Sequence, residues 1–322
     1  MNNIKDYGSN IMDQLVPSKS SLRKVGQRER DSEFYEEDLQ VRVYRPSSGM
    51  LPPSLSCDST LKFCQLDVYF PHSGTTESAP ILFFVYGGGY ASGARVFDPP
   101  DELKYKNVGA FFAKRGFVVV IADYRLYPVI KFPDPVIDIR DAFTWVVSNI
   151  GLINEDADVQ ADISRIFFMG HSAGAAIVSS MVLIPDMLSS PLRERIVGLV
   201  LNAGAYDYRG APMLPPPVVS EYHGGTDGDL RKTEPLGLLE NAPADILNVF
   251  PPILAVIGEL DFPPIVVSHG NFVTTLKKRV SSSVDTLVME GHNHISPHNS
   301  LCSGEGEQWG LDVVSWLQSK LA

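Results

Sequence analysis

Short runs of consecutive apolar residues recur along the chain from residue 66 onward. The runs contain few polar residues, which is typical of strands that are buried on both faces. A parallel sheet with helices on both sides meets that condition. Seven runs have the length of a strand: Leu66–Phe70, Ile81–Tyr86, Phe117–Ala122, Ile166–Met169, Ile196–Leu201, Ile253–Ile257 and Val284–Met289.

Segments with helical periodicity separate these runs. Because strands and helices alternate along the chain, the pattern predicts an α/β fold with a mostly parallel central sheet flanked by helices. The clearest helical segments are Asn107–Arg115, Asp134–Asn149, Ser172–Ile184, Ile265–Val280 and Glu307–Lys320.

Two stretches depart from this alternation. Residues 1–65 are polar and irregular, and they include a charged run from Arg28 to Asp38 that we interpret as a solvated helix or arm. Residues 205–250 lie between two strand-length runs and are too many for a simple crossover. Because no linker divides the chain, we expect one domain over residues 1–322, with the N-terminal arm (1–65) and the insertion (205–250) contributing to a cap.

Composition and charge narrow the classes of function. The 322 residues are 44% hydrophobic and 20% charged, which is enough for a sizeable core. The formal net charge of −11 disfavours binding to nucleic acid or to anionic lipid. No segment reaches the ~18 apolar residues of a membrane span. The N-terminal sequence MNNIKDYGSN has no features of a secretory signal, so we expect a cytoplasmic protein.

One apolar run leads directly into a candidate nucleophile. In the sequence RIFFMGHSAG, Gly170 and Gly174 stand two residues on either side of Ser172, and a helical pattern follows. G-x-S-x-G between a strand and a helix forms a tight turn that lifts the serine hydroxyl above the sheet. The helix N-terminus also favours a developing oxyanion. The alternative interpretation is a helix N-cap serine between turn glycines.

A glycine-rich segment, YGGGYASG, begins at Tyr86, the last residue of an earlier apolar run. A glycine run can direct successive N–H groups toward one point, and it lets a substrate approach the backbone. The tetrahedral oxyanion of acyl transfer needs such donors. The alternative interpretation is a flexible glycine-rich turn.

Together with GHSAG, the glycine-rich segment resembles the α/β-hydrolase fold and, within it, the hormone-sensitive-lipase-like carboxylesterases. The resemblance extends from about Leu66 to the C-terminus. It implies an oxyanion hole formed by the N–H groups of Gly88, Gly89 and Ala173. Tyr86 stands where that family usually has histidine, and its hydroxyl is a candidate replacement for the group that anchors the loop.

The acid and the base of a catalytic triad follow Ser172 in the order that this fold uses. Asp261 matches the family's G-x-x-D, and His294 matches its G-x-x-H. The resemblance implies that His294 activates the serine and that Asp261 orients the imidazole. A His-x-His pair also suggests a metal, but no further ligands cluster near it in the sequence. The alternatives are Glu259 for the acid, and His292 and His298 for the base.

The resulting expectation is a serine carboxylesterase that cleaves small to medium organic esters without a metal or a cofactor. Tyr86, Tyr90 and Tyr222 are candidates for contact with the small-molecule ester, although core packing explains such aromatics equally well. The same triad also serves acyl transfer, amide hydrolysis or carbon–carbon bond hydrolysis in a specialised metabolic pathway. A non-catalytic ligand-binding protein is a further alternative, and a homodimer is compatible with the sequence.

Overall fold

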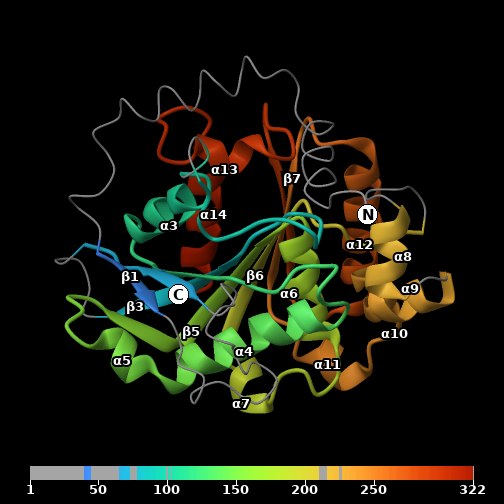
Figure 1. Cartoon of the computed structure of the whole chain (residues 1–322), viewed down its shortest axis with the longest axis horizontal. Helices are drawn as coiled ribbons and strands as arrows, with labels where there is room; N and C mark the ends of the chain where they lie inside the picture. The colour runs from blue at the N-terminus through green and yellow to red at the C-terminus, as the bar shows by residue number, and fades with distance from the viewer. Residues whose placement is uncertain are drawn as a thin grey trace.

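A mixed sheet forms the centre of the structure, a computed structural model that describes residues 40–44, 65–72, 78–98, 101, 103–209, 216–224 and 227–321. The strand order within these residues is β1-β2-β4-β3-β5-β6-β7-β8 (Figure 1). All neighbours from β4 to β8 are parallel, whereas β2 runs antiparallel to both β1 and β4. The strands are β1 (Val41–Tyr44), β2 (Leu66–Tyr69), β3 (Ser78–Val85), β4 (Val118–Ala122), β5 (Gln160–His171), β6 (Ile196–Asn202), β7 (Ile253–Gly258) and β8 (Val284–Met289).

Helices cover both sides of this sheet (Figure 1). Helices α3 (Lys106–Ala113) and α14 (Gln308–Ser319) lie on one side, and α4 (Asp134–Ser148) and α6 (Ala173–Leu183) lie on the other. Within the ranges given above, every helix is too short or too polar to span a bilayer. The remaining helices are α5 (Ile150–Asn154), α7 (Ser190–Arg193), α8 (Pro216–His223), α9 (Asp227–Thr233), α10 (Pro235–Asn241), α11 (Ala244–Asn248), α12 (Pro263–Arg279) and α13 (Ser296–Ser300).

The observed elements confirm the predicted α/β fold with its mostly parallel sheet. All seven predicted strands and all five predicted helices are present. The prediction that residues 1–65 are irregular is wrong for Val41–Tyr44, which form β1. This strand has no apolar run, because its side chains alternate between exposed and half-buried positions. The charged run from Arg28 to Asp38 lies outside the described residues.

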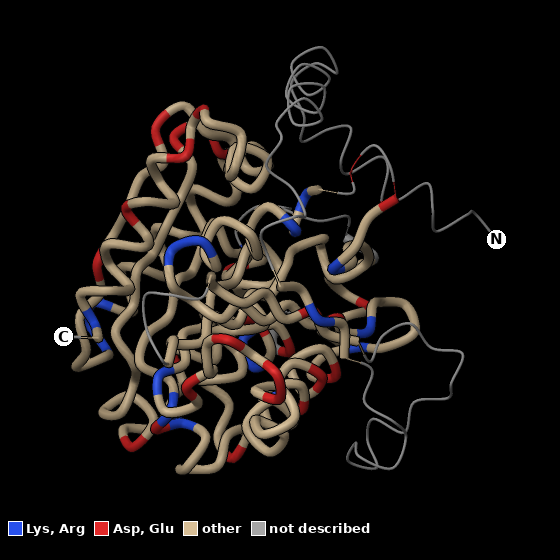
Figure 2. Tube along the Cα trace, turned by 90° about the vertical axis from the view of Figure 1, so that its left-hand side faces the viewer, with Lys and Arg blue, Asp and Glu red and all other residues tan. Residues whose placement is uncertain are grey.

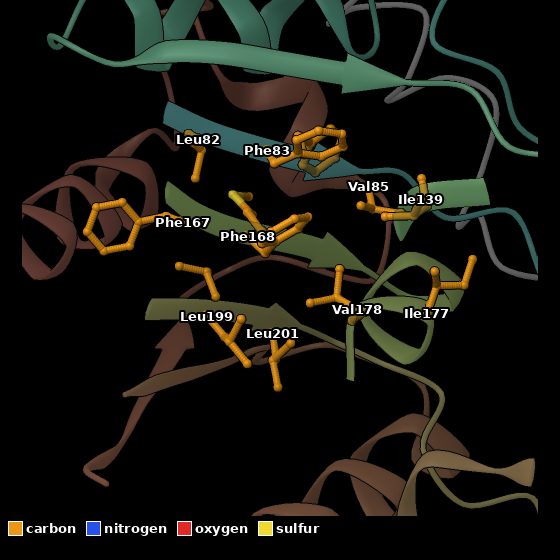
Figure 3. Close-up of a cluster of buried hydrophobic side chains, with 14 of the residues drawn as sticks. Leu82, Phe83, Val85, Ile139, Phe167, Phe168, Ile177, Val178, Leu199 and Leu201 are labelled. Atoms are coloured by element: carbon orange, nitrogen blue, oxygen red, sulfur yellow. The ribbon is translucent and has the colours of Figure 1, made fainter. Parts of the chain in front are cut away.

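Buried apolar side chains cluster around β3 and β5, in the middle of the sheet (Figure 3). The rings of Phe83 and Phe168 stack with their centroids 5.0 Å apart, and Phe143 of α4 meets Phe168 edge-on at 5.2 Å. Each such aromatic pair contributes about 0.5–1.5 kcal/mol beyond its buried area. Because close-packed side chains hold β3 and β5 together, the loops at their carboxyl ends start from a rigid support.

The insertion between β6 and β7 is helical in its described part, and α8, α9 and α10 gather beside α12 (Figure 1). Helix α10 packs against α6, α9 and α12. Tyr222 of α8 stacks on Tyr90 of the glycine-rich loop, with ring centroids 4.2 Å apart. The insertion therefore contacts the loop that carries the predicted oxyanion donors. The part of the N-terminal arm at 40–44 belongs to the sheet, and its contribution to a cap stays a prediction.

Charged residues are scattered over the described trace, with acidic and basic positions interspersed (Figure 2). No single face of the described residues therefore gathers charge of one sign (Figure 2). Interspersed acidic and basic residues favour solubility. They do not produce the large field of positive sign that would attract a polyanion.

Candidate active site

Ser172, His294 and Asp261 meet beyond the carboxyl ends of β5, β8 and β7. Nε2 of His294 lies 2.9 Å from Oγ of Ser172, and Nδ1 of His294 lies 3.0 Å from Oδ1 of Asp261. Since an ionised carboxylate only accepts hydrogen bonds, Nδ1 carries the proton and Nε2 is left to accept the serine proton. The three side chains thus stand in the order that a nucleophile, a base and a group that orients the base would need.

Ser172 occupies a strained turn between β5 and α6. Its φ of 54° and ψ of −121° fall where L-residues are rarely found. The flanking glycines permit this turn, because a Cβ on Gly174 would lie 2.1 Å from the carbonyl oxygen of Val85 and one on Gly170 would lie 2.6 Å from Cα of Ala175. The serine is half-buried while its neighbours along the chain are buried, so the turn lifts Ser172 out of the core.

The acid of this arrangement is Asp261 rather than Glu259. The side chain of Asp261 has an exposed fraction of 0%, and its Oδ1 also accepts the N–H of Phe262 at 3.0 Å. Glu259 is exposed and accepts the N–H of Gly291 at 2.8 Å. The structure therefore brings Asp261 to the imidazole and uses Glu259 to hold the following turn.

The two other candidate histidines face away from the serine. His292 donates from Nε2 to the carbonyl oxygen of Gly306 at 2.8 Å, and its Nδ1 lies 3.0 Å from Oγ of Ser296. His298 is buried, and desolvation lowers its pKa to about 3. Among the described residues, no three His, Cys, Asp or Glu side chains are grouped so as to hold a metal ion. His294 is thus the histidine that the structure places on Ser172.

The glycine-rich loop after β3 lies directly against the nucleophile. A Cβ on Gly87 would lie 2.9 Å from Cβ of Ser172. Gly88 has a φ of 138° and Gly89 a φ of 60°, both in the region that favours glycine. The carbonyl oxygen of Gly88 accepts the N–H of Ser92 at 3.0 Å, which closes the turn. Both glycines are half-buried.

Ala173 supplies the third predicted donor. It is the first residue of α6, so its N–H has no acceptor within the helix. The dipole of α6 adds partial positive charge at the same point. Gly88, Gly89 and Ala173 therefore stand on two sides of Ser172, as stabilisation of an oxyanion would require.

Comparison with known proteins agrees with this geometry. The BD-FAE family model matches residues 66–187. Esterase B from Lactobacillus rhamnosis superposes with a TM-score of 0.69 over 97% of this chain and 96% of that chain, at 15% identity. The chain has the α/β-hydrolase fold.

Sequence relatives of this chain carry different activities. Kynurenine formamidase from Drosophila melanogaster is 22% identical over 71% of this chain and 70% of its own length. The non-reducing polyketide synthase Preu6 from Preussia isomera is 26% identical over 47% of this chain, which spans 7% of that relative. The reaction must therefore be argued from the site.

Tyr86 holds the start of the glycine-rich loop. Its hydroxyl donates to Oδ1 of Asp123 at 3.0 Å, and the ring stacks on Tyr124 with centroids 4.7 Å apart. Burial raises the pKa of Asp123, and the hydrogen bonds from Arg95 and Tyr86 oppose that shift. The exposed fraction of Tyr86 is 1%, and its hydroxyl is engaged. These facts favour the anchoring interpretation over contact with substrate.

An aromatic cluster joins the glycine-rich loop to the insertion. Besides stacking on Tyr222, Tyr90 pairs its hydroxyl with that of Tyr208 at 2.8 Å. The N–H of Tyr208 donates to Glu234, whose pKa is raised to about 7 by burial. His223 packs beside Tyr90 and Tyr208, with ring centroids 5.7 Å and 5.1 Å away. Tyr90 and Tyr222 are thus placed at the border of the site.

Sequence reasoning missed several residues that hold this site. Tyr208, His223 and Glu234 lie in the insertion, where no motif marks them. His171 occupies the first variable position of G-x-S-x-G. Its place between Gly170 and Ser172 is the one sequence feature that could have marked it as part of the site. Its contacts are with loops far away along the chain, which local patterns do not encode.

Proposed function

We propose that the chain is a serine hydrolase that cleaves carboxylic esters through an acyl-enzyme intermediate. The observation that carries this proposal is the continuous line of hydrogen bonds from Ser172 through His294 to Asp261. That line begins at a strained turn that lifts the nucleophile out of the core. A purely structural serine would not need a neutral imidazole on its hydroxyl and a buried carboxylate behind it.

In the first half of the reaction, Oγ of Ser172 attacks the carbonyl carbon while Nε2 of His294 takes the serine proton. The carbonyl oxygen becomes an oxyanion, which the N–H groups of Gly88, Gly89 and Ala173 stabilise. When the oxyanion collapses, the bond to the alcohol oxygen breaks. His294 then gives its proton to the leaving alcohol, and the acyl group stays on the serine.

In the second half, a water molecule attacks the acyl-enzyme. His294 takes one proton from this water, and the new oxyanion uses the same N–H donors. Collapse of the oxyanion breaks the bond to Oγ of Ser172, and the proton on His294 returns to the serine. The carboxylic acid leaves, and Asp261 stabilises the imidazolium in both halves.

The loops and the insertion around Ser172, His294 and Asp261 would form the pockets for the acyl and alcohol groups of the ester. The insertion supports that assignment, because Tyr222 stacks on Tyr90 directly after the oxyanion donors. We infer a cap formed by residues 205–250 and by the N-terminal arm within a single domain over residues 1–322. The expected substrates are small to medium organic esters, and the expected location is the cytoplasm.

Hydrolysis of an amide is the second candidate. The match to kynurenine formamidase supports it, because that match covers a similar share of both chains. The same residues suffice, since His294 would protonate a leaving amine instead of an alcohol. Turnover of an aryl formamide compared with that of p-nitrophenyl formate, which carries the same acyl group, decides between the two.

The test of the proposal is Ser172→Ala assayed on p-nitrophenyl esters of increasing acyl length. Loss of the nucleophile typically lowers kcat by ~10⁶. Ser179→Ala is the matched control, because it removes another serine hydroxyl from the same helix and should keep turnover. Ser172→Ala that retains more than a tenth of the wild-type rate would overturn the assignment.

A further inference from the structure

His171 precedes the nucleophile and lies where three loops meet. Its Nε2 lies 2.9 Å from the carbonyl oxygen of His294, in the loop that carries the proposed base (residues 291–295, the base loop). Its other ring nitrogen faces the glycine-rich loop, because a Cβ on Gly87 would lie 3.0 Å from Nδ1. The residue itself belongs to the turn that presents Ser172. One imidazole thus contacts the nucleophile turn, the base loop and the glycine-rich loop.

The protonation state of this imidazole follows from its contacts. A carbonyl oxygen only accepts hydrogen bonds, so Nε2 of His171 carries a proton and donates it to His294. Nδ1 is buried and has no hydrogen-bond partner among the described residues. Desolvation, reinforced by His298 and His294, lowers the pKa of His171 well below its ordinary value. The ring is therefore neutral, with the proton on Nε2 and a bare lone pair at Nδ1.

The ring packing limits how this imidazole can move. The His171 ring lies 4.2 Å from that of His298 and 4.9 Å from that of His294, measured between centroids. The base loop has a second tie, because the N–H of Leu260 donates to the carbonyl oxygen of His292 at 2.8 Å. Two backbone carbonyls of the base loop, two residues apart, are thus held from opposite sides.

From these contacts we infer that His171 is a positioning residue for hydrolysis, because its hydrogen bond to the backbone of His294 sets the distance between the base and Ser172. The inference rests on the proposed function. His294 must keep its ring within hydrogen-bond distance of two groups at once, at 2.9 Å and 3.0 Å. A displacement of ~1 Å at a reacting group costs about 100-fold in rate.

Three substitutions of His171 separate the effect of its hydrogen-bond donor from the effect of its ring volume. In His171→Gln the side-chain amide reaches about as far as Nε2 and keeps a donor for His294, whereas in His171→Asn the amide reaches only as far as Nδ1. His171→Leu keeps apolar volume and has no donor. The readouts are kcat and KM on p-nitrophenyl acetate, the rate at which a fluorophosphonate probe labels Ser172, and the temperature of unfolding.

We expect His171→Asn and His171→Leu to lower kcat by about 10- to 100-fold with KM nearly unchanged, and His171→Gln to recover most of the loss. The labelling rates should follow the same order. Equal loss in the Gln and Asn variants, a loss that appears in KM, or a loss that tracks the unfolding temperature would overturn the inference.

The labelling rates also separate this inference from the proposed function. If the wild type labels at Ser172 but hydrolyses no ester, the proposed function fails, and the order of the labelling rates still decides the role of His171. If the wild type neither labels nor hydrolyses, both are overturned.

Discussion

Oδ1 of Asp123 accepts the hydroxyl of Tyr86 at 3.0 Å and the backbone N–H of Arg95 at 2.9 Å. Tyr86 stands immediately before the three glycines of the loop, and Arg95 stands a few residues after them. A single carboxylate therefore closes both ends of the segment that carries Gly88 and Gly89. This chain thus uses tyrosine where the resembling family usually has histidine.

Tyr86→Phe tests that closure, because it removes the hydroxyl and keeps the ring that stacks on Tyr124. Asp123 is half-buried and would lose one of its partners, so we expect the free energy of unfolding to fall by about 1–3 kcal/mol. Loosening of the oxyanion donors should lower kcat by about 10-fold. Urea unfolding and ester kinetics measure the two effects. Wild-type kcat in Tyr86→Phe would show that the loop does not depend on this hydrogen bond.

His294→Ala and His292→Ala should differ sharply in turnover. His294 touches Ser172, so its loss should cost at least ~10³ in kcat. The His292 ring hydrogen-bonds to Ser296 and Gly306 instead, so we expect a loss of about tenfold or less, as is typical of a supporting group. Both variants are compared at saturating ester, with unfolding curves to confirm that each is folded. The reverse ranking would identify His292 as the base.

Gly88→Ala should disable the oxyanion loop. Its φ of 138° is strained for alanine, and the new Cβ would lie 2.0 Å from the carbonyl oxygen of Ser92. Loss of one donor typically lowers kcat by ~10²–10³. The matched control is Gly270→Ala in α12, where a Cβ meets nothing within 4 Å and the helix should gain about 0.5–1 kcal/mol. Full activity in Gly88→Ala would mean that the loop supplies no donor.

His223→Phe should reduce the loss of unfolding free energy that occurs as the pH falls. Burial lowers the pKa of His223 from 6.5 to about 3, and neither ring nitrogen has a hydrogen-bond partner within the described part of the chain. Between these two values the unfolded chain binds a proton that the folded chain does not, so the free energy of unfolding falls as the pH falls. The difference in free energy of unfolding between His223→Phe and the wild type should therefore favour the variant more at about pH 5 than at about pH 7.5. Urea unfolding at both pH values tests this, and an equal difference at the two would contradict it.

The sheet was predictable from sequence because its central strands are buried on both faces. Every residue of β4 is buried, and its sequence VVVIA is an unbroken apolar run. Strand β1 carries no such signal. It is held by pairing with β2 and by Arg42, whose guanidinium donates to the backbone carbonyls of Glu155 and Asp156.

Some residues of the site could likewise be predicted from their sequence neighbours, whereas others are placed by contacts with residues far away along the chain. Ser172 and its glycines could be predicted because a tight turn is encoded within five neighbouring residues. The choice of His294 over His292 depended on a family resemblance, since both stand in the same turn. The pairing of Tyr90 with Tyr208 joins residues 118 positions apart, and no local pattern predicts it.

All residues of helix α6, beginning with Ala173, are buried. Amide hydrogens in such a helix exchange with solvent only when the whole molecule opens. Gly88 and Gly89, in contrast, are half-buried, so we expect their loop to open on its own at a smaller free energy. The two sides of the proposed oxyanion hole, α6 and the glycine-rich loop, should therefore stay closed for different times. Heating should then stop turnover at a temperature below that at which the fold is lost.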